Sequence, residues 1–342
     1  MKTLCFVICI LFLLHAAAHV ESRHHRDDRE KQPSYKLFVF GDTFVDNGNT
    51  DKEELTQWTR NWYSPYGVSD SNHRRKPTGR FSDGKVQSDF IAMLLGHDES
   101  PPPENLTQND VDPFGMNFAV AFAGVTGRLH PPNLGTQVGR FRRMLNNGII
   151  DKDMKQSVAL VAFSGYDYAD MPDDHDDLVE FIEKVTDGIV NGVEEILRLG
   201  VNKVLVNMMH PMGCTPTYTR TTTDYTECIK DNVTDIHNRM LKKKLGSSKD
   251  SVLLLDLNNE FTTIINSKKG TGFLHRHIPC CVSDEEDGYC GQVDEFGVQQ
   301  FQVCDEPGKY FYFDDWHPTQ AGWKAVIDNL AGDIKEFLDI SS

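Results

Sequence analysis

The sequence predicts an α/β fold in which a mostly parallel sheet is covered by helices on both faces. Short apolar segments alternate with longer segments of helical periodicity along most of the 342 residues, as in a chain of β-α-β units. The chain is 39% hydrophobic and 25% charged, which suits one large domain with an ample core better than two small ones. In such a fold, functional side chains gather at the carboxyl ends of the strands.

The first predicted strand is Lys36–Phe40, an apolar run. Gly41 and Asp42 end this strand and so place Thr43 at the edge of the sheet. Further strands are expected within 114–124, 157–163, 201–208 and 252–257. Helices are expected at 86–95, 134–145, 178–199, 225–245, 259–265 and 319–338, where apolar residues recur at helical spacing. Loops are expected at 61–76, 100–112 and 275–307, which are rich in turn residues, prolines or cysteines.

The amino terminus predicts secretion. Residues 1–20 combine a basic residue, an apolar run from Leu4 to Leu14 and the small residues Ala16–Ala18, which match a signal peptide. A membrane anchor is the alternative, but a membrane span needs about 20 apolar residues and this run is shorter. Residues 21–34 are too polar to bury a core and are expected to be disordered, so the folded domain is expected at 35–342. The mature protein is therefore expected in the extracellular space or in another compartment of the secretory pathway.

The even number of cysteines beyond the signal peptide also supports secretion. The cysteines beyond the signal peptide are Cys214, Cys228, Cys280, Cys281, Cys290 and Cys304, an even number that predicts three disulfides. Cys214 and Cys228 form the easiest local pair. The adjacent Cys280 and Cys281 should each pair with Cys290 or Cys304, in either arrangement. His275 and His277 would permit a zinc site, but an oxidising compartment favours disulfides, so no metal is expected.

Surface features exclude several classes of partner. The net charge of −16 argues against binding to nucleic acid or to an anionic membrane surface. The compact basic run 242–244 fits the solvated end of a helix.

Two sequons predict glycans at Asn105 and Asn232. The turn after Phe40 lacks the glycine spacing of a dinucleotide or phosphate loop, so no cofactor is expected.

Short blocks at the predicted strand ends resemble the plant GDSL esterase/lipase family, a branch of the SGNH hydrolases. Residues 38–49, FVFGDTFVDNGN, are similar to the family pattern FVFGDSxxDxGN, and Gly79–Ser82 are similar to its GRFS segment. Residues 164–168, SGYDY, are similar to SGNDY, and 314–318, DDWHP, match DxxHP. The resemblance spans nearly all of 35–340. It implies a single-domain three-layer α/β/α sandwich with a mostly parallel, flavodoxin-like sheet.

The resemblance also implies a catalytic arrangement. Thr43 stands where the family has its nucleophilic serine, and Asp314 and His317 stand where it has its acid and base. A carboxylate that orients one imidazole nitrogen leaves the other free to accept the proton of a nucleophile, and a threonine hydroxyl can be that nucleophile. The threonine methyl group stiffens χ1 and crowds the approach to a carbonyl carbon. Attack by Thr43 should therefore be slow.

Two further family positions are altered in the blocks that would stabilise an oxyanion. Residues 117–124 read NFAVAFAG where relatives have a sequence like NFASGGAG, so Phe122 replaces a glycine. We expect that Phe122 cannot readily take glycine-only backbone angles and that its ring fills part of the pocket. Tyr166 replaces an asparagine donor, and its phenol should donate from several Å further out. Losing one oxyanion donor typically costs about a hundredfold to a thousandfold in rate.

The sequence thus supports two hypotheses. The first is a secreted hydrolase of a lipid or other small acyl ester that uses Thr43, His317 and Asp314 with weak activity. The second is a catalytically inactive binding or accessory protein that uses the same cleft, for which a protein partner is expected. Labelling with a fluorophosphonate probe separates the two, because only an activated hydroxyl reacts.

Overall fold

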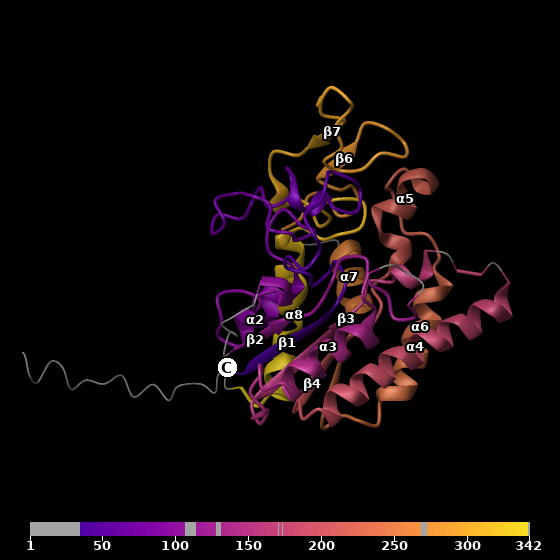
Figure 1. The fold of residues 1–342 in the computed structure, drawn as a ribbon. Coiled ribbons are helices and arrows are strands. Elements are labelled where there is room, and N and C mark those ends of the chain that lie inside the picture. Colours follow the sequence, from indigo (N-terminus) through magenta and orange to yellow (C-terminus); the bar gives the residue numbers. More distant parts are fainter. Residues whose placement is uncertain are drawn as a thin grey trace, which may run out of the picture.

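The computed structural model describes residues 35–106, 114–127, 131–169, 171–172, 174–267 and 272–340. The predicted signal peptide and the polar segment 21–34 lie outside these ranges, as does Thr107, the third residue of the Asn105 sequon. The described residues form a layered body around a central sheet, with loops stacked above one end of the strands (Figure 1).

The central sheet has five strands, all parallel, in the order β2-β1-β3-β4-β5. The strands are β1 Lys36–Gly41, β2 Gly115–Asn117, β3 Ser157–Ala162, β4 Lys203–Asn207 and β5 Val252–Leu255. In the register of the sheet, Val39 pairs with Leu160, and Leu160 pairs with Leu205. This is the strand order of flavodoxin-like sheets, which confirms the predicted fold class.

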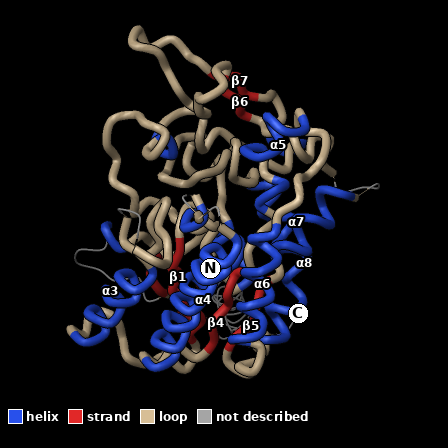
Figure 2. The backbone as a smooth tube through the Cα atoms, turned by 90° about the vertical axis from the view of Figure 1, so that its right-hand side faces the viewer, coloured by secondary structure: helices blue, strands red, loops and turns tan. Residues whose placement is uncertain are grey.

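Helices cover both faces of the sheet because successive strand residues point to opposite sides. Phe38 and Phe40 of β1 belong to one buried core, whereas Leu37 and Val39 belong to the other. The first core is closed by α3 Leu134–Asn146, α4 His175–Arg198 and α6 Asn232–Leu245, and the second by α2 Gln87–Leu94, α7 Leu257–Asn266 and α8 Gln320–Phe337. Figure 2 shows the helices around the strands and the loops above them.

The helix predicted at 225–245 is wrong at its start. The structure has a short helix, α5 Pro216–Thr223, followed by a non-helical segment, and α6 begins only at Asn232. Asp224 ends α5 with a φ of +48°, and the disulfide between Cys214 and Cys228 ties the following segment to the turn before α5. The side chain of Asp231 then caps α6 by accepting hydrogen bonds from two main-chain N–H groups. These tertiary ties override the helical pattern of the sequence.

The predicted disulfides are formed. Cys214 pairs with Cys228, Cys280 with Cys304 and Cys281 with Cys290, which resolves the two arrangements left open by the sequence. Because the cysteines near His275 and His277 are all paired in disulfides, they are not available as zinc ligands.

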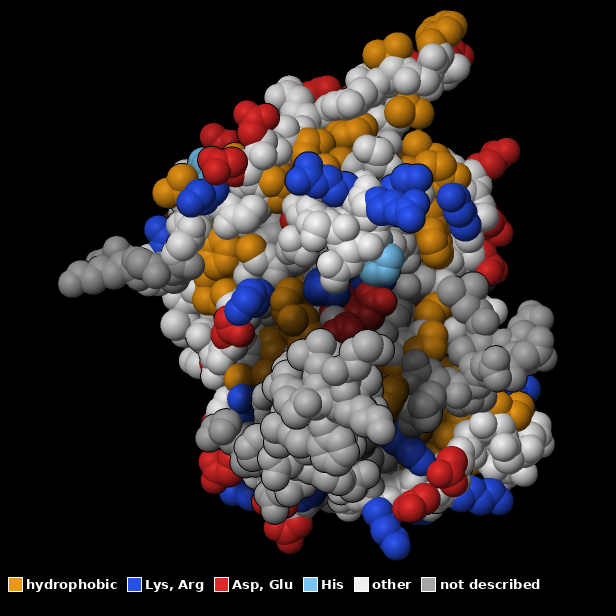
Figure 3. Space-filling model, turned by 90° about the vertical axis from the view of Figure 1, so that its left-hand side faces the viewer, with side chains coloured by type: hydrophobic (Ala, Val, Ile, Leu, Met, Phe, Trp, Pro, Cys, Tyr) orange, Lys and Arg blue, Asp and Glu red, His pale blue; other side chains and the backbone are white. Residues whose placement is uncertain are grey.

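The last two disulfides brace an arm that projects above the sheet. The arm contains β6 Cys281–Ser283 and β7 Phe301–Val303, which pair in antiparallel fashion (Figures 1 and 2). Its tip exposes the apolar side chains of Val293, Phe296 and Val298. On the face drawn in Figure 3, hydrophobic side chains gather at this tip, and acidic and basic side chains are interspersed over the described surface below it.

None of the helices within the described ranges is both long and apolar enough to cross a membrane.

Candidate active site

Thr43 lies at the point where the strand order of the sheet reverses. It follows β1, and Tyr166 follows the neighbouring strand β3, so both occupy the crevice in which open α/β sheets bind their ligands. The turn that carries Thr43 depends on Gly41, where a Cβ atom would lie 2.0 Å from the carbonyl oxygen of Ala162. Only glycine allows the two strand ends to approach this closely.

The structure brings Thr43, His317 and Asp314 together in one hydrogen-bonded row. Nε2 of His317 lies 2.9 Å from Oγ1 of Thr43. Nδ1 of His317 lies 2.8 Å and 2.9 Å from the two carboxylate oxygens of Asp314. The main-chain N–H groups of Trp316 and His317 also donate to Asp314, which fixes the carboxylate. All three side chains are fully buried.

Arg60 adds a buried cation that the sequence analysis missed. Its Nη2 atom lies 3.3 Å from Oδ2 of Asp314 and 2.9 Å from Oδ1 of Asp315. The Tyr66 hydroxyl donates to the same Asp314 oxygen at 2.7 Å and accepts from Nε of Arg60. Burial alone would raise the pKa of Asp314, but His317 and Arg60 outweigh burial and hold this pKa well below its usual range. The carboxylate therefore stays ionised.

Tyr166 lies closer to the nucleophile than the sequence analysis predicted. Its hydroxyl is 3.4 Å from Oγ1 of Thr43 and 3.3 Å from Nε2 of His317, so the expectation that it would act from several Å further out is wrong. The side chain reaches back over Thr43 because the 3-10 turn Tyr166–Tyr168 follows directly after Gly165, which has a φ of +104°. Burial, together with the charge of Asp42, raises the pKa of Tyr166 well above its usual value. The phenol therefore keeps its proton.

Phe122 adopts the backbone conformation that we expected it to resist. Its φ is +61°, in the left-handed region, which a non-glycine residue can occupy at a cost of about 1 kcal/mol. Its ring packs edge-on against Trp58, Phe81 and Tyr166, with centroids 4.8 Å, 5.0 Å and 5.0 Å away. These ring contacts offset the strain of the left-handed conformation, and the Phe122 ring forms part of the wall of a pocket next to Tyr166.

Asp42 joins the turns after β1 and β3. One of its oxygens accepts from the main-chain N–H and the hydroxyl of Ser164, at 2.6 Å and 2.8 Å, and the other accepts from the N–H of Phe44. Burial raises the pKa of Asp42 to about 7, although these hydrogen bonds act in the opposite direction. Asp42 thus holds Thr43 and Tyr166 in a fixed relation.

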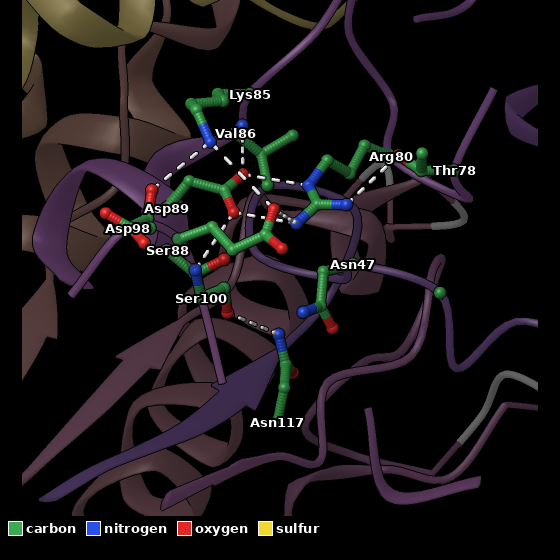
Figure 4. Close-up of polar contacts among 12 residues, drawn as sticks. Asn47, Thr78, Arg80, Lys85, Val86, Ser88, Asp89, Asp98, Ser100 and Asn117 are labelled. Carbon is green, nitrogen blue, oxygen red and sulfur yellow. Dashed lines mark hydrogen bonds and ion pairs between the residues drawn. The ribbon is translucent and has the colours of Figure 1, made fainter. Parts of the chain in front are cut away.

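The GRFS segment has a structural part in the site. Arg80 makes a buried two-pronged contact with Asp89 of α2, at 2.9 Å and 2.8 Å (Figure 4). Asp89 also accepts from the main-chain N–H groups of Val86 and Ser100. This anchored segment carries Phe81, whose ring lies 4.9 Å from the ring of His317. Phe81 therefore excludes water from the imidazole.

An aromatic pocket of about 340 Å³ lies beside this row of residues. Its walls include Trp58, Phe122, Tyr166, Tyr218 and Trp316. Thr43 is not part of the walls, because Tyr166 lies between the pocket and the Thr43 hydroxyl.

The predicted glycosylation sites lie at different places on the surface. Asn105 is exposed and donates to the carbonyl oxygen of Gly48 at 3.1 Å. Asn232 is exposed at the start of α6, but Thr234 of the same sequon is buried and donates to the carbonyl oxygen of His210.

Comparison with known proteins identifies the family to which this chain belongs. The family model for GDSL-like lipase/acylhydrolase matches residues 37–330. Two proteins of Arabidopsis thaliana named as GDSL esterase/lipases are 34% and 33% identical; the matches cover 86% and 91% of this chain and 85% and 91% of theirs. An acetylxylan esterase from Geobacillus stearothermophilus overlaps with 91% of this chain and 96% of its own, at 11% identity and a TM-score of 0.39, which is too low to bear on function. The chain belongs to the GDSL-like lipase/acylhydrolase family.

Proposed function

We propose that the protein is a secreted ester hydrolase with weak activity toward a lipid or other small acyl ester. Thr43 would be the nucleophile, His317 the base and Asp314 the group that orients it. The observation that carries this proposal is the unbroken row from Thr43 Oγ1 through His317 to Asp314, with contacts of 2.9 Å and 2.8 Å. A hydroxyl, an imidazole and a carboxylate in this order define the nucleophile, base and orienting group of acyl transfer.

Each step of the reaction has a group to perform it. Nε2 of His317 takes the proton of Thr43 as Oγ1 attacks the carbonyl carbon of the ester, and the carbonyl oxygen becomes an oxyanion. His317 then gives this proton to the leaving alkoxide, which departs as an alcohol and leaves an acyl-threonine. Water attacks the acyl group with His317 again as base, and the acid and the free hydroxyl of Thr43 are released. Ionised Asp314 stabilises the imidazolium that forms in both halves.

Weak activity follows from what surrounds Thr43. The threonine methyl group crowds the carbonyl carbon, and the Tyr166 hydroxyl lies where a substrate carbonyl must approach. Tyr166 must move before a substrate reaches Thr43. Once Tyr166 has moved, the main-chain N–H of Phe122 is the oxyanion donor that the family resemblance still offers.

Full burial of the site supports a second candidate, an inactive binding or accessory protein. Thr43, His317 and Asp314 are all closed to solvent, and Tyr166 contacts both members of the nucleophile–base pair. A cleft used only for binding has no need to admit an ester to Thr43.

A fluorophosphonate probe distinguishes the candidates. The hydrolase should be labelled slowly on Thr43, and labelling should disappear in Thr43→Ala and in His317→Ala. Thr222→Ala is the matched control, because the Thr222 hydroxyl donates to the carbonyl oxygen of Tyr218 and Thr222 does not line the pocket, so labelling should persist. Labelling that is absent from the native chain, or that persists in His317→Ala, would favour the binding protein.

A further inference from the structure

The aromatic pocket beside Tyr166 has the walls of a ring-binding site. Six of the residues around it carry large rings: Trp58, Phe122, Tyr166, Tyr168, Tyr218 and Trp316. The Trp58 side chain forms part of the mouth, since the residue is 54% exposed despite its size. A concave pocket lined mainly by aromatic side chains, with a few polar groups among them, is the usual form of a small-molecule binding site.

The rings are already spaced for aromatic contacts. Phe122 meets Trp58 edge-on at 4.8 Å and Tyr166 at 5.0 Å, whereas Trp316 lies 5.8 Å from Tyr166 and 6.3 Å from Tyr218. Aromatic pairs are favourable at centroid distances of 4.5–7 Å, in edge-to-face or offset arrangements. A planar ring that entered the pocket would therefore find both edges and faces to pack against.

The charged groups of the pocket argue against an anionic ligand. Arg60 is the cation in its wall, but its nitrogens already contact Tyr66, Asp314, Asp315 and the carbonyl oxygen of Gln57. Asp315 also lines the pocket, with about half of its side chain exposed. A carboxylate or phosphate would meet this acidic group without a free cation to balance it.

We propose that this pocket binds a neutral aromatic ring, so that esters that carry such a ring are the favoured substrates. The inference rests on the proposed hydrolase function for turnover, but the binding itself does not. Tyr166 separates the pocket from Thr43, so the displacement of Tyr166 that turnover requires would open the pocket to the nucleophile and place the ester of a bound ring beside it.

Calorimetric titration of the mature His317→Ala chain tests the proposal without turnover. The probes are methyl 3-phenylpropanoate and methyl 3-cyclohexylpropanoate, which have equal numbers of heavy atoms and differ only in the aromaticity of the ring. The phenyl ester should bind about threefold to tenfold more tightly, the factor that favourable ring pairs add beyond burial of area. Equal affinities, tighter binding of the cyclohexyl ester, or no measurable binding of either would overturn the proposal.

Two variants of the same chain locate the binding. Trp58→Leu should reduce the preference for the phenyl ester to less than about twofold, because it removes one of the ring partners. Phe296→Leu is the control: Phe296 is 83% exposed on the arm and does not line the pocket, so the preference should persist. A preference that survives Trp58→Leu would overturn the site. Lack of turnover in the native chain would contradict the hydrolase function and leave this binding result intact.

Discussion

Replacing Tyr166 in a Thr43→Ser background should convert the closed site into an open one. The Tyr166 oxygen lies 3.4 Å from the hydroxyl oxygen of Thr43, and an attacked carbonyl carbon must come within about 3–3.5 Å of the nucleophile. The phenol therefore occupies the space that the carbonyl group needs. Thr43→Ser alone removes a methyl group but leaves this obstruction, so it should restore little activity.

The size of the effect follows from two contributions. Displacing the phenol breaks its contacts with Thr43 and His317, at about 1 kcal/mol for each net hydrogen bond. Asparagine at the same position restores a side-chain donor, and one oxyanion donor is worth about a hundredfold to a thousandfold in kcat. The double change Thr43→Ser, Tyr166→Asn should exceed Thr43→Ser by at least about a hundredfold in kcat/KM. Adding Phe122→Gly should contribute less, because Phe122 already has a φ of +61°.

Initial rates on a short acyl ester measure this effect, with Thr43→Ser, Tyr166→Phe as the matched control. The control removes the hydroxyl but keeps the ring and provides no donor, so it should gain much less than the asparagine variant. Equal rates for the two double variants would refute the donor argument. A Thr43→Ser single variant as fast as the asparagine variant would refute the obstruction.

Arg60→Met should lower the free energy of unfolding by about 3 kcal/mol, because it leaves the triad carboxylate buried without its cation; a loss below about 1 kcal/mol in denaturant titration would contradict this. The free energy of unfolding should also fall as the pH drops from 6.5 toward 4. Burial lowers the pKa of His210 to about 4 and that of His237 to about 3 in the folded chain. The unfolded chain binds both protons near pH 6.5, so acid favours the unfolded state. His237→Gln should make this fall shallower by up to about 1.4 kcal/mol per pH unit, and an unchanged slope would exclude His237 as a cause. Intact mass should show glycans at Asn105 and Asn232 that glycosidase removes, and alkylation of the unreduced, denatured chain at several thiols would conflict with the three disulfides.

The strands and most helices could be predicted because their signals are local, whereas the Thr43–His317–Asp314 row was predicted from the resemblance of short sequence blocks to the GDSL family. A buried strand in a parallel sheet is a short apolar run, and an Asp and a His three residues apart in one turn can contact each other directly. The parallel sheet then brings the ends of distant strands to one edge. This explains how residues 274 positions apart, Thr43 and His317, come to lie 2.9 Å from each other.

Contacts between irregular segments could not be predicted. Arg60 lies in a loop that has no hydrophobic periodicity, so its sequence carries no sign that it reaches Asp314, 254 positions away. The conformation of Phe122 depends on rings supplied by three other loops, and glycine propensity alone gave the wrong expectation. Tyr166 was placed too far out because the reach of a side chain depends on the turn that carries it.

Hydrolysis of short and long acyl esters by the purified native chain, beside its His317→Ala variant, tests the central claim most directly. The account predicts a slow hydrolysis by the native chain that falls at least about a hundredfold in His317→Ala, because loss of a triad base removes most of the catalytic effect. Native hydrolysis no faster than the uncatalysed reaction, or hydrolysis that survives His317→Ala, would contradict the claim that Thr43 and His317 act together as an ester hydrolase.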